Sequence, residues 1–198
     1  MRAVLQKVLQ ASVTVSDKVV GKIGPGVCVL IGISHEDTRD DLEYMAKKIL
    51  SMRVFEDQSG AMWKKNVKDL GLQILCVSQF TLYGKTTKGS KPDFHEAMKS
   101  SESRQFFDDF VKRLGELYDR EKIETGEFGA MMQVALVNDG PVTLQLDSRK
   151  FSYEAAKPDQ KLNAIAAAKE QRRQGFAGAS STSTASATPV DTVKETEN

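Results

Sequence analysis

Polar side chains interrupt an apolar, strand-like run at residues 78–82, which read Ser-Gln-Phe-Thr-Leu. A strand that ends in Ser78, Gln79 and Thr81 loses burial energy unless these groups find hydrogen-bond partners. Cross-strand hydrogen bonding is the ordinary explanation and, on residue types alone, slightly the better one. The alternative is a site at which hydroxyl, amide and backbone N–H groups bind a substrate.

A second interruption lies at residues 138–143, which read Asn-Asp-Gly-Pro-Val-Thr. Asn, Asp, Gly and Pro are the residues that dominate tight turns. By themselves they predict a hairpin turn between two strands, 130–137 and 142–147. Pro141 would also stop the sheet from growing at that edge, because proline has no N–H to donate.

Familiar catalytic motifs are missing from the chain. It contains no G-x-S-x-G elbow, no H-E-x-x-H pair, no P-loop and no G-x-G-x-x-G after a strand. The two histidines, His35 and His95, lie at loop edges beside acidic residues, which is typical of solvated surface histidines. A triad of His95 with Ser78 or Thr81 stays open, but no spacing favours it.

Cys28 and Cys76 lie inside apolar runs, as small core residues of a protein from a reducing compartment do. This interpretation makes a disulfide, a metal pair or a reactive thiolate unexpected. No metal-ligand spacing is visible elsewhere in the chain. We therefore expect an activity that needs neither a metal nor another cofactor.

The composition predicts one sizeable folded domain without a membrane span. The 198 residues are 40% hydrophobic, and 28 basic against 27 acidic residues give a formal net charge of +1. A nearly neutral chain can bind nucleic acid only through a local basic patch. No apolar run is long enough to cross a membrane, and the N-terminal sequence MRAVLQKV lacks a secretory signal. We expect a cytoplasmic protein, with the nucleus as an open alternative.

Hydrophobic periodicity predicts alternating strands and helices over the first 153 residues. This pattern favours a mixed α/β single domain whose curved sheet has helices packed on one side, although it leaves the strand order open. The predicted elements are a strand pair within 2–15, a turn at 24–26, strands 27–33, 53–56 and 73–82, helices 36–52 and 103–118, and the two strands around residues 138–141.

The composition changes after residue 153. Residues 159–174 are rich in Ala, Lys, Glu and Gln, which favours a short helix. From residue 175 onward Gly, Ser, Thr and Ala dominate, and too little apolar surface remains to support a fold. We therefore predict two parts, a folded domain 1–153 and a C-terminal extension 154–198 that ends in a disordered tail.

The motifs SQFTL at 78–82 and NDGPVT at 138–143 resemble the two signature motifs of the D-aminoacyl-tRNA deacylase family. The similarity extends in order over nearly all of residues 1–150 and is greatest to eukaryotic members. It includes the opening MRAVLQKV and ASVTV, then GVCVLIGI, KPDF at 91–94 and FGAMMQV at 128–134.

The resemblance implies a homodimer with a barrel-like sheet and with each active site at the subunit interface. The Gly140–Pro141 bond would be cis, and this segment would reach from one subunit into the pocket of the other. Its backbone carbonyls would crowd the side of the substrate on which an L side chain projects. A D-residue or glycine would fit, so the enzyme would hydrolyse D-aminoacyl-tRNA and also glycyl-tRNA mischarged on tRNA-Ala.

The resemblance also assigns the remaining site residues. Ser78, Gln79, Phe80 and Thr81 would form the catalytic wall, with backbone N–H groups near Phe80 and Thr81 binding the oxyanion. No side-chain nucleophile is then needed, because water assisted by the 2′-hydroxyl of the terminal adenosine can attack an activated ester. A covalent Thr81 nucleophile is the rival mechanism.

Three further residues match positions at which the family contacts its substrate or orients its motif. Phe128 and Met132 would hold the terminal adenosine of the tRNA, although without the resemblance ordinary packing would be the better interpretation. Lys7 stands where the family usually has an arginine that orients the Gly-Pro segment. A lysine offers a point charge in place of a fork of donors, which puts discrimination against L-substrates in doubt.

Two rival hypotheses remain. In the first, the protein binds nucleic acid through its C-terminal extension without catalysis. The extension carries six basic and six acidic residues, so its net charge of zero is weak support for DNA binding. In the second, the chain is a non-enzymatic scaffold, which would have no need for polar groups at its strand ends.

Overall fold

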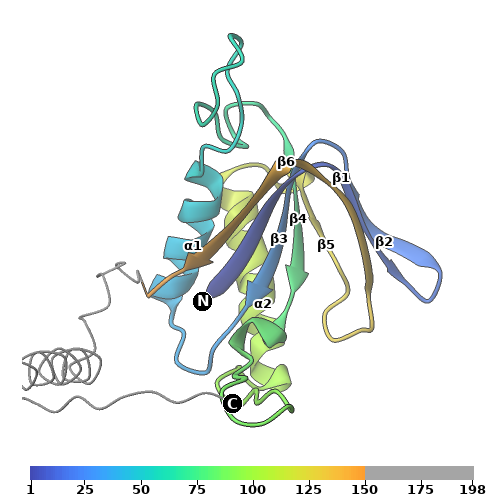
Figure 1. The fold of residues 1–198 in the computed structure, drawn as a ribbon, viewed down its shortest axis with the longest axis vertical. Coiled ribbons are helices and arrows are strands. Elements are labelled where there is room, and N and C mark those ends of the chain that lie inside the picture. The colour runs from blue at the N-terminus through green and yellow to red at the C-terminus, as the bar shows by residue number, and fades with distance from the viewer. Residues whose placement is uncertain (150–198) are drawn as a thin grey trace, which may run out of the picture. The chain divides into compact units, whose positions relative to one another are not determined.

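A curved sheet of six strands forms the centre of the computed structural model, which describes residues 1–149 (Figure 1). The predicted helix at 159–174, the predicted tail and the boundary at residue 153 lie outside the described residues. The strands are β1 (Arg2–Val15), β2 (Lys18–Ile23), β3 (Gly26–Gly32), β4 (Gln73–Ser78), β5 (Ile123–Thr125) and β6 (Gln133–Asp147).

The long strand β1 organises the sheet. The strand order is β2-β1-β3-β4-β5, and β6 pairs with the other edge of β1. β1 is antiparallel to β2, β3 and β6, whereas β3, β4 and β5 are parallel to one another. The carboxyl ends of these three parallel strands therefore lie at one edge of the sheet.

Two α-helices cover one face of the sheet, as the periodicity predicts. They are α1 (Arg39–Ser51) and α2 (Ser100–Leu117), and 3-10 turns lie at Phe80–Tyr83 (η1) and Arg120–Lys122 (η2). No helix among residues 1–149 combines the length and apolarity that a membrane span requires. All five residues of the predicted α1 stripe are buried against the sheet, namely Leu42, Met45, Ala46, Ile49 and Leu50.

Apolar side chains cluster on both faces of the sheet, so the curved sheet also encloses an apolar interior. One cluster joins the sheet to the helices, and the other contains Val8, Val13 and Leu75 on the concave face. Gly21 of β2 lies so close to β5 that a Cβ atom there would be 2.2 Å from the Thr125 carbonyl oxygen. This close approach nearly closes the sheet, which confirms the predicted barrel-like architecture.

Two predicted elements, the strand pair within 2–15 and the strand 53–56 after α1, are wrong in detail. Residues 2–15 form one strand and not a pair, and the next strand along the chain is the largely exposed β2, whose sequence carries no apolar alternation. Residues 53–56 make only an isolated bridge between Phe55 and Lys65. In each case the available pairing partner decided whether the segment forms a strand, and local residue propensity predicts such pairing poorly.

The predicted hairpin at 138–141 is also wrong. Residues 133–147 form the single strand β6, which pairs with β1 along most of its length. Asn138 pairs with Val8 and Thr143 with Gln6, so residues 139–142 bulge out opposite Lys7 alone. The turn-forming residues thus serve a bulge within a strand, because β1 continues past it and holds both halves of β6.

The predicted strand 73–82 ends four residues early, at Ser78. The Gln79 N–H donates to the Ile31 carbonyl oxygen at 2.7 Å, which is the last backbone hydrogen bond to β3 among the described residues. The chain then turns into η1, where the Leu82 N–H donates to the Gln79 oxygen and the Gly84 N–H to the Thr81 oxygen. This turn removes Phe80 and Thr81 from the sheet.

Asp41 makes the stability of the fold depend on pH. Its carboxylate accepts hydrogen bonds from Thr38 at the start of α1 and from Ser148 after β6. Desolvation raises the pKa of Asp41, but these hydrogen bonds outweigh it and lower the pKa to about 2. Because the folded pKa lies below the unfolded one, the contribution is complete above pH ~4 and is lost as the pH falls towards 2.

We expect Asp41→Asn to lower the free energy of unfolding at pH 6 and to flatten its decline between pH 4 and 2. Denaturant titrations at several pH values measure both effects. The control is Asp40→Asn, because Asp40 is exposed and makes no hydrogen bond to a described residue. An Asp41→Asn profile parallel to that of the native chain would contradict the assignment.

Candidate active site at the ends of the parallel strands

The carboxyl ends of β3, β4 and β5 bring distant loops together. Ser78 at the end of β4 pairs with Ile31 of β3, and Thr125 at the end of β5 pairs with Cys76. The loops 79–99 and 126–132 therefore leave from the same edge of the sheet, at the lower end of Figure 1. In sheets with parallel strands this edge is the usual place for a ligand.

The turn η1 leaves two adjacent backbone amides free. Neither the Phe80 nor the Thr81 N–H donates to any residue that the structure describes, whereas the Gln79 and Leu82 amides are both engaged. The first N–H groups of a helical turn have no acceptor within the turn. Two neighbouring free donors of this kind can bind the oxyanion that forms when an ester is attacked.

The side chains of the turn do not form a nucleophile–base pair. Gln79 Nε2 donates to the Thr81 hydroxyl at 2.6 Å. His95 Nδ1 lies 2.6 Å from Asp93, and no hydrogen bond joins His95 to Ser78 or Thr81 in the described chain. The open alternative of a hydroxyl–histidine triad therefore has no support in the geometry.

The two thiols are equally unsuited to catalysis. Cys28 and Cys76 are both buried, as predicted. Burial raises the pKa of Cys28 to about 11 and that of Cys76 further still. Neither residue is a thiolate near neutral pH, and thiolates are the reactive form.

An exposed aromatic ring flanks the free amides. Phe80 is 57% exposed, and its ring meets that of Phe94 edge-on with centroids 5.0 Å apart. Phe94 packs closely on Gly84, where a Cβ atom would be 3.0 Å from the Phe94 ring. Phe94 belongs to the KPDF segment, yet nothing local in that segment predicts its contact with Phe80.

Phe128 and Met132 lie in the neighbouring loop, between β5 and β6. The Arg104 guanidinium lies 5.0 Å from the Phe128 ring centroid and donates to the Phe128 carbonyl oxygen at 2.9 Å. Met132 packs on the concave cluster, and its sulfur lies 2.6 Å from the place of a Cβ atom on Gly126. Both side chains are half-buried at the edge of the sheet where η1 lies.

Arg2 links η1 to the end of β6 at this edge of the sheet, although no sequence pattern marks this residue. Its Nη1 donates to the Leu82 carbonyl oxygen at 3.1 Å, and its guanidinium carbon lies 4.5 Å from the Tyr83 ring centroid. Its Nε donates to Asp147 at the end of β6, also at 3.1 Å. Arg2 thus holds the end of η1 in place from the other end of the chain.

The Gly140–Pro141 segment is held by its own neighbours. The peptide bond between the two residues is cis, and both residues are exposed. Asn138 closes the base of the bulge, because its Nδ2 donates to the Thr143 hydroxyl and its Oδ1 accepts from the Val142 N–H, each at 3.0 Å. The Asn138 side chain thereby replaces backbone hydrogen bonds that β6 would otherwise make with β1 at this point.

Lys7 supports the same bulge from beneath. Its Nζ lies 2.8 Å from Asp139 and 3.0 Å from Glu56, and its side chain is only 5% exposed. Burial lowers the pKa of Lys7, but the two carboxylates outweigh it and raise the pKa overall. Lys7 therefore reaches the segment through Asp139, by charge, without the fork of donors that an arginine offers.

The two motif segments do not meet within one chain. Ser78 of β4 pairs with Ile31 of β3, and Ile31 pairs in turn with Ala3 of β1. Residues 139–142 of β6 lie opposite Lys7, which is four residues further along β1. Four residues span about 13 Å along a strand, and the segments are also three strand spacings of ~4.8 Å apart. Figure 1 shows the middle of β6 at the upper end of the sheet and the loops after β4 at the lower end.

Comparison with known proteins identifies the family. The model of the D-Tyr-tRNA(Tyr) deacylase family matches residues 4–147. The chain belongs to this family. Its Drosophila melanogaster relative, a D-aminoacyl-tRNA deacylase, is 55% identical over 148 residues, which cover 75% of this chain and 92% of the relative. The human D-aminoacyl-tRNA deacylase 1 is 50% identical over 160 residues, 81% of this chain and 76% of the relative.

Solved structures show the same deacylase-family fold. A c-Myc DNA Unwinding Element Binding Protein superposes with a TM-score of 0.72 and 52% identity, covering 74% of this chain and 98% of that one. A probable eukaryotic D-amino acid tRNA deacylase superposes with a TM-score of 0.64 over the same shares. At 22% identity, the second likeness concerns the fold alone.

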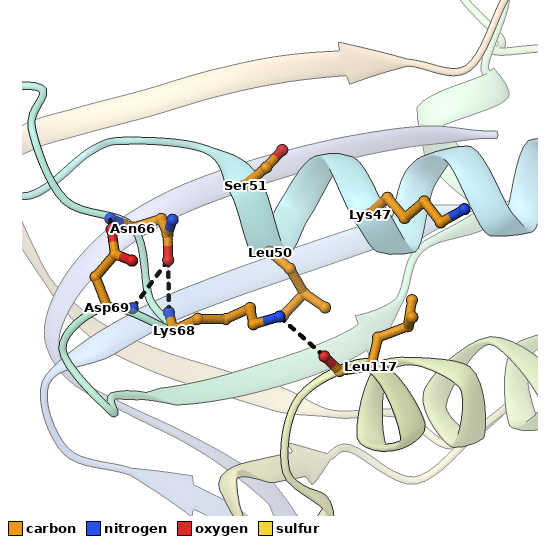
Figure 2. A pocket seen from close by; sticks show the side chains of 7 residues that line it. All are labelled: Lys47, Leu50, Ser51, Asn66, Lys68, Asp69 and Leu117. Atoms are coloured by element: carbon orange, nitrogen blue, oxygen red, sulfur yellow. Dashed lines mark hydrogen bonds between the residues drawn. The ribbon is translucent and has the colours of Figure 1, made fainter.

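A separate hollow of about 420 Å³ in this deacylase-family chain lies away from the motif residues, between the ends of α1 and α2 (Figure 2). Lys68 Nζ donates to the Leu117 carbonyl oxygen at 3.0 Å, and Asn66 Oδ1 accepts from the Lys68 and Asp69 amides. These groups close the end of α2 and the loop beside it. The hollow brings together none of the predicted site residues.

Proposed function

We propose that the protein hydrolyses the ester of D-aminoacyl-tRNA at a site shared by two copies of the chain. One copy contributes Ser78, Gln79, Phe80 and Thr81, and the other contributes Gly140 and Pro141. The observation that carries this proposal is the separation of two exposed segments, both matching family motifs, at opposite ends of one sheet. A second copy can bring the two segments together, which a single chain does not do.

The chemistry follows from the free amides of η1. The N–H groups of Phe80 and Thr81 bind the ester carbonyl oxygen and stabilise the negative charge that develops on it. An aminoacyl ester is already activated, so a positioned water, assisted by the adenosine 2′-hydroxyl, completes the attack. The Thr81 hydroxyl, which accepts from Gln79, positions this wall and forms no covalent bond.

The site selects D- over L-aminoacyl substrates by steric exclusion. Backbone carbonyls of the Gly140–Pro141 segment occupy the side of the substrate Cα where an L side chain projects. A D-residue leaves that side free, and glycine has no side chain to clash, so glycyl-tRNA is a second substrate. Excluding one hand in this way works for every side chain, whereas favourable contacts would need a different pocket for each.

The edge of β6 supports the homodimer. Among the described strands β6 pairs only with β1, so one side of this 15-residue strand is unpaired. Long unpaired edges are usually covered in stable proteins. Five exposed apolar side chains, 38% to 61% accessible, lie on β1, β2 and β6, namely Leu9, Val19, Val20, Val134 and Val137. A second copy would bury them.

Parallel incubation with D-Tyr-tRNA and L-Tyr-tRNA tests the proposed function. We expect rapid loss of the D-ester alone, measured as acid-precipitable label over time at equal enzyme concentration. The molecular mass in solution, measured on the same sample, should be that of a dimer. Equal rates for the two esters, or full activity from a monomer, would contradict the proposal.

A second candidate function is DNA binding, because one similar solved protein is named for binding a DNA unwinding element. In this hypothesis the C-terminal extension 154–198 binds DNA without catalysis. Salt-sensitive retention on DNA by the extension alone would support it. Retention that requires residues 1–149 and disappears with excess tRNA would assign the binding to the deacylase site.

A further inference from the structure

Residues 85–93 form a short two-stranded arm beside the candidate active site. The Lys85 N–H donates to the Asp93 carbonyl oxygen at 2.7 Å, and the Asp93 N–H donates back to Lys85 at 2.9 Å. The arm leaves the sheet directly after η1 and returns at Phe94, whose ring contacts Phe80. The arm is therefore anchored to the same turn that carries the free amides.

The charges of the arm divide into a paired base and an unpaired tip. At the base, Lys85 pairs with Glu96 at 2.6 Å, and Asp93 lies 2.6 Å from His95. At the tip, Lys88 and Lys91 are exposed and make no ion pair with any residue in the described part of the chain. Glu96 and Asp93 are thus paired at the base of the arm, which leaves two uncompensated positive charges at the tip.

The tip offers hydrogen-bond donors and nothing that would repel an anion. Residues 86–91 read Thr-Thr-Lys-Gly-Ser-Lys and are all exposed, with no acidic and no large apolar side chain among them. Lysine, threonine and serine side chains together with backbone N–H groups are the usual partners of nucleic-acid phosphates. A protein surface that bound an apolar partner would need apolar side chains, which this tip lacks.

We propose that the tip of this arm, with Lys88 and Lys91, binds backbone phosphates of the tRNA acceptor end while the terminal adenosine lies at η1. This inference rests on the proposed function, because it requires the aminoacylated end to occupy that site. The tip lies roughly three residues beyond the Lys85–Asp93 bridge, or about 10 Å at ~3.3 Å per residue. That distance is about three nucleotides along one strand of a nucleic-acid helix at ~3.4 Å each.

The charge of the whole chain explains why such an arm matters. With a net charge of +1, the protein has no general attraction for a polyanion, so binding depends on local charge. Each phosphate that a lysine neutralises contributes about 0.7–0.9 to the salt dependence of binding on a logarithmic scale. With two such contacts, we expect Lys88 and Lys91 to contribute a measurable share of the affinity for tRNA. They should contribute nothing to the affinity for a substrate without phosphates.

The test compares the native dimer with Lys88→Ala/Lys91→Ala on two substrates, D-Tyr-tRNA and D-tyrosyl-adenosine, which has no phosphate. On D-Tyr-tRNA we expect kcat/KM to fall about tenfold through KM, with the slope of log(kcat/KM) against log[salt] shallower by about 1.5. On D-tyrosyl-adenosine kcat/KM should not change. The control Lys112→Glu changes the net charge equally on the exposed face of α2 and should leave both values as they are.

Three outcomes would overturn the inference. An unchanged salt slope, or equal losses on the two substrates, would mean that the arm supports the fold of the site and does not bind phosphate. Loss of DNA retention with unchanged turnover of tRNA would assign the lysines to another polyanion. If the native protein hydrolysed neither substrate, the proposed function would fail, and filter binding of uncharged tRNA by the same variants would still test the arm.

Discussion

Gly140→Ala is expected to lower kcat/KM for D-Tyr-tRNA by about 100-fold or more, because a shift of ~1 Å in a positioning segment can cost this much. Gly140 has a φ of +114°, which L side chains rarely adopt. A Cβ atom there would lie 2.8 Å from Val142 Cγ2 and 3.2 Å from the Val142 nitrogen. Since Val142 is buried and bonded to Asn138, the segment itself must move. Initial rates with the purified variant measure the loss.

Gly60→Ala is the matched control for this substitution. Gly60 also has a positive φ of +80°, but a Cβ atom there would meet nothing within 4 Å. Both substitutions should cost about 1–2 kcal/mol of folding free energy through backbone strain, while only Gly140→Ala should lose activity. Native activity in a folded Gly140→Ala variant would remove this segment from the active site.

Phe80→Pro is expected to lower kcat about 100- to 1,000-fold below that of Phe80→Ala, which is the cost of removing one oxyanion donor. Proline removes the free N–H, whereas alanine removes the ring and keeps it. The backbone suits proline, because Phe80 begins the 3-10 turn and Gln79 before it, with φ −145° and ψ 82°, lies outside the α region that a following proline disfavours. Single-turnover rates on D-Tyr-tRNA separate this loss from substrate binding.

Thr81→Ala distinguishes the oxyanion mechanism from a covalent one. The Thr81 hydroxyl accepts a hydrogen bond from Gln79 and makes no hydrogen bond to a histidine or carboxylate of the described residues, so its removal should leave most of the activity. Loss of several orders of magnitude with an intact fold would restore the nucleophile hypothesis. Equal rates for Phe80→Pro and Phe80→Ala would place the oxyanion elsewhere.

Mixing two inactive variants tests whether the site is shared. Subunits of Gly140→Ala and Phe80→Pro that exchange at random would give half heterodimers, each with one intact site, so about a quarter of the native activity should return. No recovery after verified exchange would mean that both defects lie in the same chain's site.

The sequence alone determined the elements whose residues repeat with a local period. The α1 stripe, the doubly buried β3 and the apolar part of β4 all carry their burial pattern in neighbouring residues. The two motifs also stand out locally, since polar and turn-forming residues interrupt apolar runs at 78–82 and 138–143. Their resemblance to a known family predicted the architecture of the domain, which the structure confirms.

Only the tertiary structure decided what those motifs become. Residues 138–143 form a bulge within one strand because β1, more than 120 residues away in the chain, pairs with both flanks. Arg2 lies 80 residues from Leu82 in the turn it holds, and Lys7 is also far from Asp139 in the chain. Such contacts leave no local period, because they arise from pairing between segments whose spacing in the chain is arbitrary. The sequence thus indicated which residues are unusual, and the sheet determined which of them lie together.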